Sequence, residues 1–222
     1  ALELDGRPQA LDLVRRIEHA HDHLIQLYED LRGYAAPVVM HRDVQNVSDI
    51  VLDAWNSLLS LHKDRVVRLI GNQEHGAVYC AVDRSRLEQV FRNILENALA
   101  ACADPVEITW RLSEAEAEDG RVIRIVLADN GPGLSDEQRQ RLFDPFYTTK
   151  SNGTGLGMPI CKQIVEAHGG GIAVENLPGR GAKFIITLPN ADVPRRANEQ
   201  RQNAKSGEPH DVRIRCGACG GS

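Results

Sequence analysis

The 222-residue sequence has no long hydrophobic run and no excess of basic residues. Its apolar stretches fall far short of the roughly 18 residues that a membrane-spanning helix needs, and no signal peptide is visible. With 26 Lys and Arg against 31 Asp and Glu, the formal net charge is −5. A whole-molecule charge of this sign does not favour nucleic acid or an anionic membrane surface. The sequence therefore predicts neither a nucleic-acid partner nor membrane contact within this chain.

Cysteine is sparse, and its five residues are scattered. Cys80, Cys102 and Cys161 fall in apolar patterns, which predicts buried, reduced thiols and is consistent with a cytoplasmic compartment. Cys216 and Cys219 have the spacing of half a zinc knuckle, but a tetrahedral structural site needs a second pair, and none accompanies them. They end a polar segment, residues 191–222, which we expect to be a disordered tail.

The chain is organised around the stretch from Asp129 to Gly157. The alternating run 122–128 predicts a strand that delivers Asp129 at its carboxyl end, and residues 158–168 have the periodicity of a helix. Between them lies a long loop bracketed by glycines, which predicts a mobile lid. Glycines allow close approach of backbone to a ligand, and a helix start favours phosphate. This order of strand, loop and helix suggests a nucleotide site.

An upstream helix, Ser85 to Ala101, supports that interpretation. Its apolar positions recur every three and four residues, so one face is buried. Asn93 and Asn97 are four apart and lie on a common stripe, with Glu96 beside it. A carboxamide oxygen is a ligand suited to Mg²⁺, which takes one or two protein oxygens plus phosphates and water. The alternative is that the two asparagines only hydrogen-bond neighbouring loops.

Together these segments resemble the ATP-binding domain of histidine kinases, in the superfamily that also holds gyrase, Hsp90 and MutL. Four motifs carry the resemblance, in order and at family spacing: an N box at 91–98, a G1 box at 129–134, an F box at 143–146 and a G2 box at 153–158. Residues 169–176 and 179–189 are similar to the closing hairpin, so the match covers about 40–190. The resemblance implies an α/β fold, a two-layer sandwich with a mixed sheet and three helices on one face.

The resemblance also implies roles for individual residues and the cofactors ATP and Mg²⁺. Asp129 would accept from the adenine amino group, while Gly131 and Gly133 let the base lie against backbone. Asn97 would ligate Mg²⁺, with Asn93 completing the site directly or through water. Thr149 and Lys150 would reach the terminal phosphates. The phosphates would be cradled by Gly153, Thr154, Gly155, Leu156 and Gly157.

Three positions bear on the reaction. Relatives that hydrolyse ATP or phosphorylate a hydroxyl commonly carry Glu where this chain has Asn93, so Asn93 favours histidine as the acceptor, with Lys150 supporting the transfer. Glu96 is the alternative candidate for a base, although an exposed charge also explains it. Ala101 stands where many relatives place an aromatic residue near the adenine, which leaves stacking on the base unassigned.

Residues 9–36 predict a long helix with a heptad seam. Its apolar positions alternate four and three apart: Leu13, Ile17, Ala20, Leu24, Leu27, Leu31 and Tyr34. Such a narrow stripe predicts a homodimer. The helix resembles the second helix of a histidine-kinase dimerisation domain, but the phosphoacceptor motif of that family is absent. His19, His21 and His23 flank the seam; we interpret them as solvated histidines rather than as a metal site or a replacement acceptor.

Shorter elements complete the prediction. A helix is expected over 48–62 with Ser48 as its N-cap, and two strands, 65–70 and 77–82, about Gly71-Asn72. Asp83 is a candidate cap for the asparagine-bearing helix. Strands 106–112 and 121–128 are expected to flank an acidic, mobile loop, 113–120.

These observations predict three regions: a partial dimerisation helix at 1–37, an ATP-binding catalytic domain at 38–190 and the tail at 191–222. We expect the catalytic region of a sensor histidine kinase that works with a response regulator in two-component signalling. Its acceptor histidine would lie outside this chain, which then starts inside a longer kinase and autophosphorylates little by itself. The alternatives are a serine kinase of the anti-sigma type and a non-catalytic ATP-binding or dimerisation module.

Overall fold

The computed structural model describes residues 8–36, 39–59, 62, 65–73, 77–117, 120–150, 153–177 and 180–190. The tail predicted at 191–222, with Cys216 and Cys219, lies outside the described residues, and so do the side chains of His19 and His23. Within the described part, no helix combines the length and the apolar character that crossing a membrane requires.

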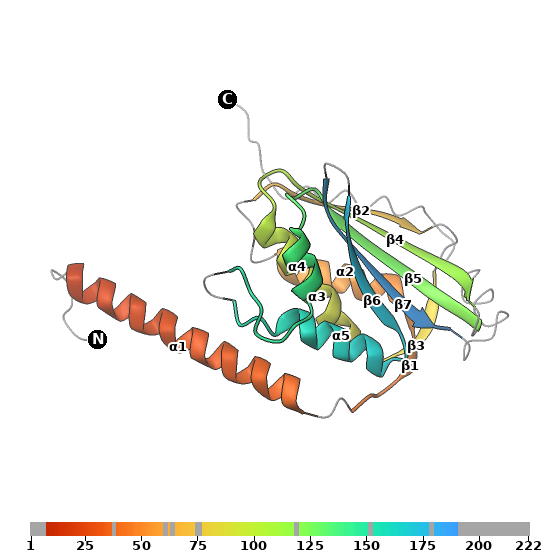
Figure 1. The fold of residues 1–222 in the computed structure, drawn as a ribbon, viewed down its shortest axis with the longest axis horizontal. Helices are drawn as coiled ribbons and strands as arrows, with labels where there is room; N and C mark the ends of the chain where they lie inside the picture. Colours follow the sequence, from red (N-terminus) through yellow and green to blue (C-terminus); the bar gives the residue numbers. More distant parts are fainter. Residues whose placement is uncertain are drawn as a thin grey trace.

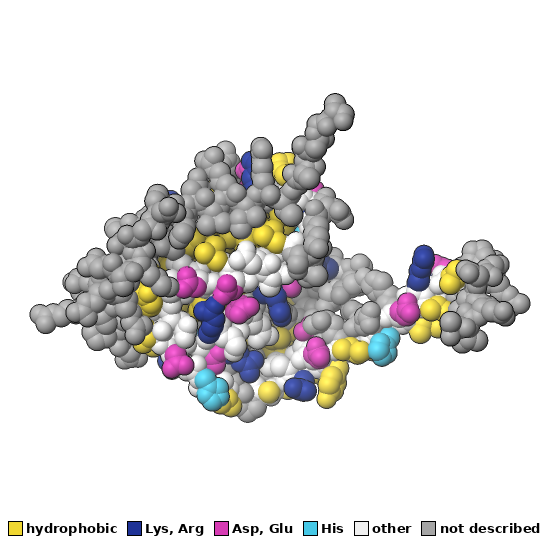
Figure 2. Space-filling view, turned by 180° about the vertical axis from the view of Figure 1, so that it is seen from behind, with side chains coloured by type: hydrophobic (Ala, Val, Ile, Leu, Met, Phe, Trp, Pro, Cys, Tyr) yellow, Lys and Arg dark blue, Asp and Glu magenta, His cyan; other side chains and the backbone are white. Residues whose placement is uncertain are grey.

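Helix α1 spans Pro8–Ala35, which confirms the long helix predicted over 9–36. Figure 1 shows that it extends away from the rest of the chain. Seam residues are exposed: Leu13 is 56%, Ile17 59% and Leu24 63% accessible. Figure 2 shows hydrophobic side chains along α1 among charged ones. Among the described side chains of α1, Tyr34 near the end of the helix packs on the core, and most of the apolar stripe is uncovered.

The remainder forms two layers (Figure 1). A five-stranded sheet has the order β2-β4-β5-β7-β6, with β2 parallel to β4 and the other pairs antiparallel. Its strands are β2 (Val67–Gln73), β4 (Val106–Ala117), β5 (Gly120–Asp129), β6 (Gly171–Leu177) and β7 (Arg180–Pro189). A two-stranded sheet joins β1 (Asp43–Asn46) to β3 (Tyr79–Val82). The helices of the second layer are α2 (Val47–Leu59), α3 (Arg84–Ala101) and α5 (Gly157–Ala167). The predicted sandwich is confirmed.

Helix α3 lies in the middle of the helical layer, between α2 and α5. The apolar face predicted from its periodicity is buried: Leu87, Val90, Phe91, Ile94, Leu95, Ala98 and Leu99. The side chains of strand β5 alternate between the core and the outside, as predicted: Ile123, Ile125 and Leu127 are buried while Arg124 is exposed. Asn93 and Asn97 lie at the margin of the buried face of α3 and are half-buried. The packing of α3 therefore fixes where both carboxamides stand.

Asp83 caps α3, as predicted. Its Oδ1 accepts from the backbone N–H of Arg86 at 3.1 Å and from the Ser85 hydroxyl, while Oδ2 accepts from the backbone N–H of His41 at 2.9 Å. Burial raises the pKa of the Asp83 carboxyl, but these hydrogen bonds outweigh burial, and the pKa is lowered below its ordinary value of 3.8. The ionised cap thus contributes to stability above that ordinary value, and its contribution is lost as pH falls through the lowered one.

Replacing Asp83 with Ala is expected to lower the free energy of unfolding by about 1–2 kcal/mol at neutral pH, because α3 loses its cap. The difference between parent and variant should shrink below pH 3.8, where the carboxyl of the unfolded chain is protonated. Urea unfolding at several pH values measures the loss of stability at neutral pH and its decrease at low pH. Asp53→Asn is the control, since Asp53, as far as the described residues show, interacts through one exposed ion pair with Arg84. An equal loss in the two variants would contradict a capping role.

The start of α2 corrects one prediction. Ser48 is not the N-cap: the helix begins at Val47, and Asn46 Oδ1 accepts from the Ser48 N–H at 3.2 Å. Asn46 Nδ2 also donates to Asp49 Oδ1 at 2.8 Å. Both residue types are good caps, and the one directly before the first helical residue has the required geometry.

The predicted break at Gly71-Asn72 is also wrong, because β2 runs through both residues. Gly71 lies opposite Trp110 in the register of β2 and β4, and a Cβ at Gly71 would stand 2.0 Å from Trp110 Nε1. Glycine is needed here for the close approach of an indole rather than for a turn. The strands predicted at 65–70 and 77–82 do not pair with each other, because β2 pairs with β4 while β3 pairs with β1.

The acidic loop predicted at 113–120 is mostly strand. The β4–β5 ladder continues to the pair Ala117 and Gly120. Glu116 lies opposite Arg121 in this ladder, and such a pair of opposite charges favours pairing rather than opposing it. The cysteine prediction, in contrast, is confirmed: Cys80, Cys102 and Cys161 are buried, and none of the three forms a disulfide.

Candidate functional site

A cleft of about 870 Å³ lies between α3, the end of β5, the connection from 132 to 155 and the start of α5. Most of the residues predicted for the site line it: Asn93, Asn97, Asp129, Gly133, Thr149, Lys150, Gly153, Thr154, Gly155 and Gly157. Gly131 and Leu156 do not. Leu156 is fully buried beneath the start of α5, and Gly131 acts through its backbone. The sequence motifs thus converge on one cavity.

Asp129 is the last residue of β5 and stands half-buried in the cleft wall. Its Oδ1 accepts from the backbone N–H of Gly131 at 2.8 Å and of Ala182 at 3.1 Å, and Cys102 Sγ lies 3.7 Å away. Among the described residues, every hydrogen bond to this carboxylate ends on Oδ1. The arrangement fixes the carboxylate and leaves Oδ2 to accept from a ligand.

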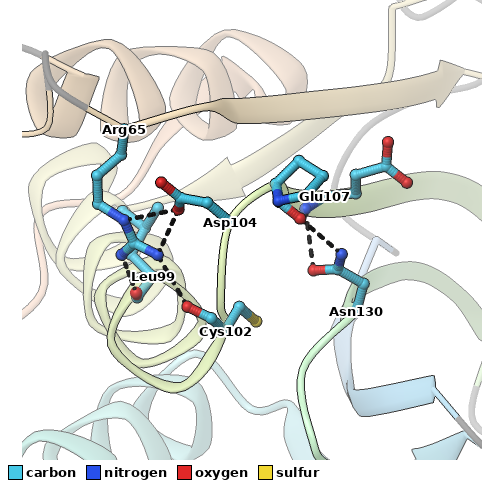
Figure 3. Close-up of polar contacts among 7 residues, drawn as sticks. Arg65, Leu99, Cys102, Asp104, Glu107 and Asn130 are labelled. Atoms are coloured by element: carbon cyan, nitrogen blue, oxygen red, sulfur yellow. Dashed lines mark hydrogen bonds and ion pairs between the residues drawn. The ribbon is translucent and has the colours of Figure 1, made fainter.

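Two side chains, Asn130 and Arg65, hold neighbouring segments of the cleft wall together (Figure 3). Asn130 Oδ1 accepts from the Glu107 N–H at 3.0 Å, and its Nδ2 donates to the Pro105 carbonyl at 2.9 Å, so the end of β5 is tied to the start of β4. Arg65 donates to the carbonyls of Leu99 and Cys102 and pairs with Asp104. It satisfies carbonyls that the end of α3 leaves open.

The two asparagines of α3 have different partners. Asn93 Nδ2 donates to the Gly157 carbonyl at 3.1 Å, which joins α3 to the start of α5. Asn97 Oδ1 accepts from Lys150 Nζ at 2.6 Å. Although much of the Lys150 side chain is exposed, partial desolvation of its ammonium group in the cleft lowers its pKa, and the negative charge of Glu96 partly opposes that shift. The Asn97 oxygen therefore faces a position that holds a cation, which fits the predicted magnesium ligand.

A backbone hydrogen bond joins the two ends of the segment that carries Lys150. The Phe146 N–H donates to the Gly155 carbonyl at 3.1 Å, and both residues have positive φ, 64° and 70°. Thr149 and Lys150 are exposed on the segment between them. The N-cap residue of α5, Leu156, forms no side-chain capping bond. The first N–H groups of α5 are therefore left to a ligand, and a helix start favours an anion.

The first half of the predicted lid is structured. Helix α4 spans Asp136–Arg141 and begins with a capping box between Ser135 and Gln138. Leu134, just before it, exchanges two hydrogen bonds with the Asn176 side chain, at 2.9 and 2.6 Å. The prediction of one long loop without regular structure is wrong here, because a six-residue helix is too short to give a periodic pattern.

Two buried thiols border the site. Burial and the neighbouring Asp129 charge raise the pKa of Cys102 to about 11. Burial raises the pKa of Cys161 to about 12, although a hydrogen bond from Asn93 acts in the opposite direction. Both therefore remain protonated at neutral pH and act as small packing residues rather than as nucleophiles.

The cleft also contains residues that the sequence analysis missed. Gln89 precedes Asn93 by four, so the helical stripe of Asn93 and Asn97 could have identified it. Asp30 on α1 and Ala182 on β7 had no local signal, because they reach the site from distant parts of the chain. Of the three histidines on α1, His21 is exposed.

Comparisons with known proteins agree with this geometry. The profile of the Histidine kinase-, DNA gyrase B-, and HSP90-like ATPase family matches residues 82–192. The sensor histidine kinase ZraS of Klebsiella oxytoca is 32% identical over 185 residues, which are 83% of this chain and 39% of ZraS. The alginate biosynthesis sensor protein KinB of Pseudomonas aeruginosa is 30% identical over 194 residues, 85% of this chain and 32% of KinB. The chain thus spans well under half the length of these relatives.

Solved structures show the same fold. The nucleotide-free catalytic domain of the histidine kinase ThkA superposes with a TM-score of 0.61 at 26% identity, covering 68% of this chain and 97% of that domain. ThkA in complex with the response regulator protein TrrA superposes with a TM-score of 0.70 at 22% identity, covering 85% of this chain and 53% of ThkA. From the matched profile and the cleft that its motifs build, the chain belongs to the histidine kinase-, DNA gyrase B- and HSP90-like ATPase family and carries an ATPase catalytic domain of the sensor histidine kinase kind.

Proposed function

We propose that the chain binds Mg·ATP in this cleft and serves as the catalytic region of a sensor histidine kinase. The γ-phosphoryl group would pass to a histidine that this chain does not itself contain. The observation that carries the proposal is the convergence of a fixed carboxylate, Asp129, a cation-facing carboxamide, Asn97, and the glycine-rich segment on one cavity.

At the base end of the cleft, Asp129 Oδ2 would accept from the adenine amino group. Its other oxygen already receives the N–H groups of Gly131 and Ala182, so the free oxygen has a fixed direction. Guanine has a carbonyl where adenine has this amino group, and a carboxylate facing it would repel. Asp129 would thus select adenine through one charged hydrogen bond.

At the phosphate end, Lys150 and the N–H groups at the start of α5 would hold the terminal phosphates. Asn97 would ligate Mg²⁺, with Asn93 beside it. When bound, Mg²⁺ supplies a positive charge that neutralises the phosphate oxygens. Asn97 Oδ1 would become available to the metal when the Lys150 ammonium group moves from it to a phosphate.

The transfer step requires little of the protein beyond positioning. A neutral imidazole nitrogen would form the new bond to phosphorus as the bond to the β-phosphate oxygen breaks, and ADP would leave. The attacking nitrogen already has a lone pair, so no base has to remove a proton from it, and the proton on the other ring nitrogen would pass to water after the bond forms. This fits Asn93, whose amide group donates to Gly157, and it fits Glu96, which pairs with Arg92 at 3.7 Å rather than standing alone in the cleft.

Calorimetry and labelling test the proposal. We expect the purified chain to bind ATP in the presence of Mg²⁺, to bind GTP much more weakly, and to incorporate little label from γ-labelled ATP by itself. Adding a fragment that carries a histidine acceptor helix should give acid-labile phosphohistidine on that fragment. Failure to bind Mg·ATP would indicate a non-catalytic module, and acid-stable phosphoserine on a partner would indicate a serine kinase of the anti-sigma type.

The proposed function also assigns a role to each region of the chain and a protein partner. Residues 1–37 would be part of a dimerisation helix and 38–190 the catalytic domain, with the tail after them. A response regulator would receive the phosphoryl group from the histidine, as the complex of ThkA with TrrA suggests by analogy. The buried cysteines Cys80, Cys102 and Cys161, which form no disulfide, fit a reducing compartment such as the cytoplasm.

Homodimerisation through 9–36 yields a prediction. Replacing Ile17 and Leu24 together with Asp should convert a dimer into a monomer, because both side chains are exposed on the seam of α1 and would place charge in the interface. Sedimentation equilibrium measures the change. Glu18→Gln is the control, since Glu18 follows Ile17 on the outer side of the seam. A parent chain that is monomeric at high concentration would contradict the assignment.

A further inference from the structure

One contact joins α1 to the glycine-rich segment of the cleft. Thr154 Oγ1 donates to Asp30 Oδ2 at 2.5 Å, and Asp30 also lines the cleft. We propose that Asp30 is a clasp that holds α1 on the nucleotide-free cleft, and that a nucleoside triphosphate releases it. The inference rests on the proposed function and adds a coupling between nucleotide binding and the position of α1.

The Thr154 hydroxyl cannot donate to Asp30 and to a bound phosphate at the same time. Thr154 has a single O–H donor, and in this structure Asp30 receives it. The oxygen of the same hydroxyl accepts from the Leu156 N–H at 3.4 Å, next to the start of α5. A phosphate oxygen bound at that helix start would compete with Asp30 for the one proton. The hydroxyl can therefore serve the carboxylate or the phosphate, but not both.

Charge acts in the same direction. Asp30 places a carboxylate at the edge of the cleft, whose phosphate side holds two features that suit an anion, Lys150 and the uncapped start of α5. A bound triphosphate would bring several negative charges close to that carboxylate, and like charges in a partly buried site repel strongly. The nucleotide would thus weaken the Asp30 contact even before it claims the Thr154 hydroxyl.

The packing of helix α1 on the core is limited, so loss of the Asp30 contact should change the position of the helix. Tyr34 packs against the core, but Tyr28 and Leu31, on either side of Asp30, are exposed. In the heptad seam Asp30 occupies a flanking g position, so its contact with Thr154 leaves the seam itself available for a second helix. Coupling between two sites is reciprocal, and so a partner or signal that moves α1 should change nucleotide affinity by the same factor.

Charge and hydrogen bonding can be separated with variants of the full chain. We expect Asp30→Ala to bind Mg·ATP about tenfold more tightly than the parent, within the usual range of such couplings. Asp30→Asn keeps an acceptor for Thr154 but loses the charge, and should lie between the two. Adenosine, which has no phosphate, should bind all three proteins equally. Glu29→Gln is the matched control, because Glu29 is the exposed acid next to Asp30 on α1.

A second measurement follows α1 directly. Hydrogen–deuterium exchange of its amides should rise when a non-hydrolysable ATP analogue with Mg²⁺ is added to the parent, whereas in Asp30→Ala it should be high from the start. Equal affinities for Mg·ATP in the parent, Asp30→Ala and Glu29→Gln would overturn the clasp, and so would weaker binding by Asp30→Ala. Neither result affects the proposed function, which fails only if the parent itself does not bind Mg·ATP.

Discussion

Replacing Asp129 with Asn is expected to weaken Mg·ATP binding by roughly 10- to 150-fold, corresponding to about 1.5–3 kcal/mol for a hydrogen bond to a charged group. The position occupied by Oδ1 receives two backbone N–H groups, from Gly131 and Ala182. If the Asn oxygen takes that position, its NH₂ group faces the adenine amino group, donor against donor. If the side chain is reversed, the two N–H groups lose their acceptor. Neither orientation satisfies every group.

Calorimetry with Mg·ATP measures this loss, and thermal unfolding shows whether the fold persists. Asp136→Asn is the matched control: Asp136 lies in α4, its side chain is 87% exposed, and its partner is Arg139 on the same helix. Its affinity for Mg·ATP should equal that of the parent. If Asp129→Asn also binds like the parent, adenine is recognised elsewhere and the assignment of Asp129 is wrong.

Local periodicity predicted most strands and every helix of the described residues except the short α4, because burial on one face leaves a regular trace in the sequence. The buried positions of α3 agree residue for residue with the predicted face. Strand pairing leaves no such trace. The parallel pairing of β2 with β4 depends on residues about 40 positions apart, such as Val67 and Val106. The role of Gly71 was missed for the same reason, since the residue that demands a glycine there is Trp110, on another strand.

The groups of the candidate site are likewise of two kinds, those with a local signal in the sequence and those that only the fold brings to the cleft. Its glycines, asparagines and Asp129 lie in short motifs, so their residue types and spacing were visible in the sequence. The groups that fix Asp129 were not visible, because one of them is the N–H of Ala182, and a backbone group has no residue signature. Asp30 is a similar case: it belongs to a heptad helix, where a charged residue beside the seam is ordinary, and only the fold brings it to Thr154.

Replacing Gly155 with Ala is expected to destabilise the chain by about 2 kcal/mol or more and to weaken Mg·ATP binding by roughly 100-fold. Gly155 has a φ of 70°, where a side chain costs about 1–2 kcal/mol. A Cβ there would also stand 2.5 Å from the carbonyl carbon of Phe146, a backbone atom. To relieve that contact, the hydrogen bond from Phe146 to Gly155 must open, and with it the base of the segment that carries Thr149 and Lys150.

A second glycine of the same motif separates this effect from a general intolerance of substitution. Gly157 has no positive φ, and a Cβ there would meet Asn93 Nδ2 at 3.7 Å, an ordinary contact. Gly157→Ala should therefore unfold at nearly the temperature of the parent, whereas Gly155→Ala should unfold several degrees lower. Because Gly155 acts on the phosphate side, its variant should lose affinity for Mg·ATP far more than for adenosine. Equal losses for both ligands would mean that the whole cleft has collapsed, and the tie between Phe146 and Gly155 would then not be what orders the phosphate segment.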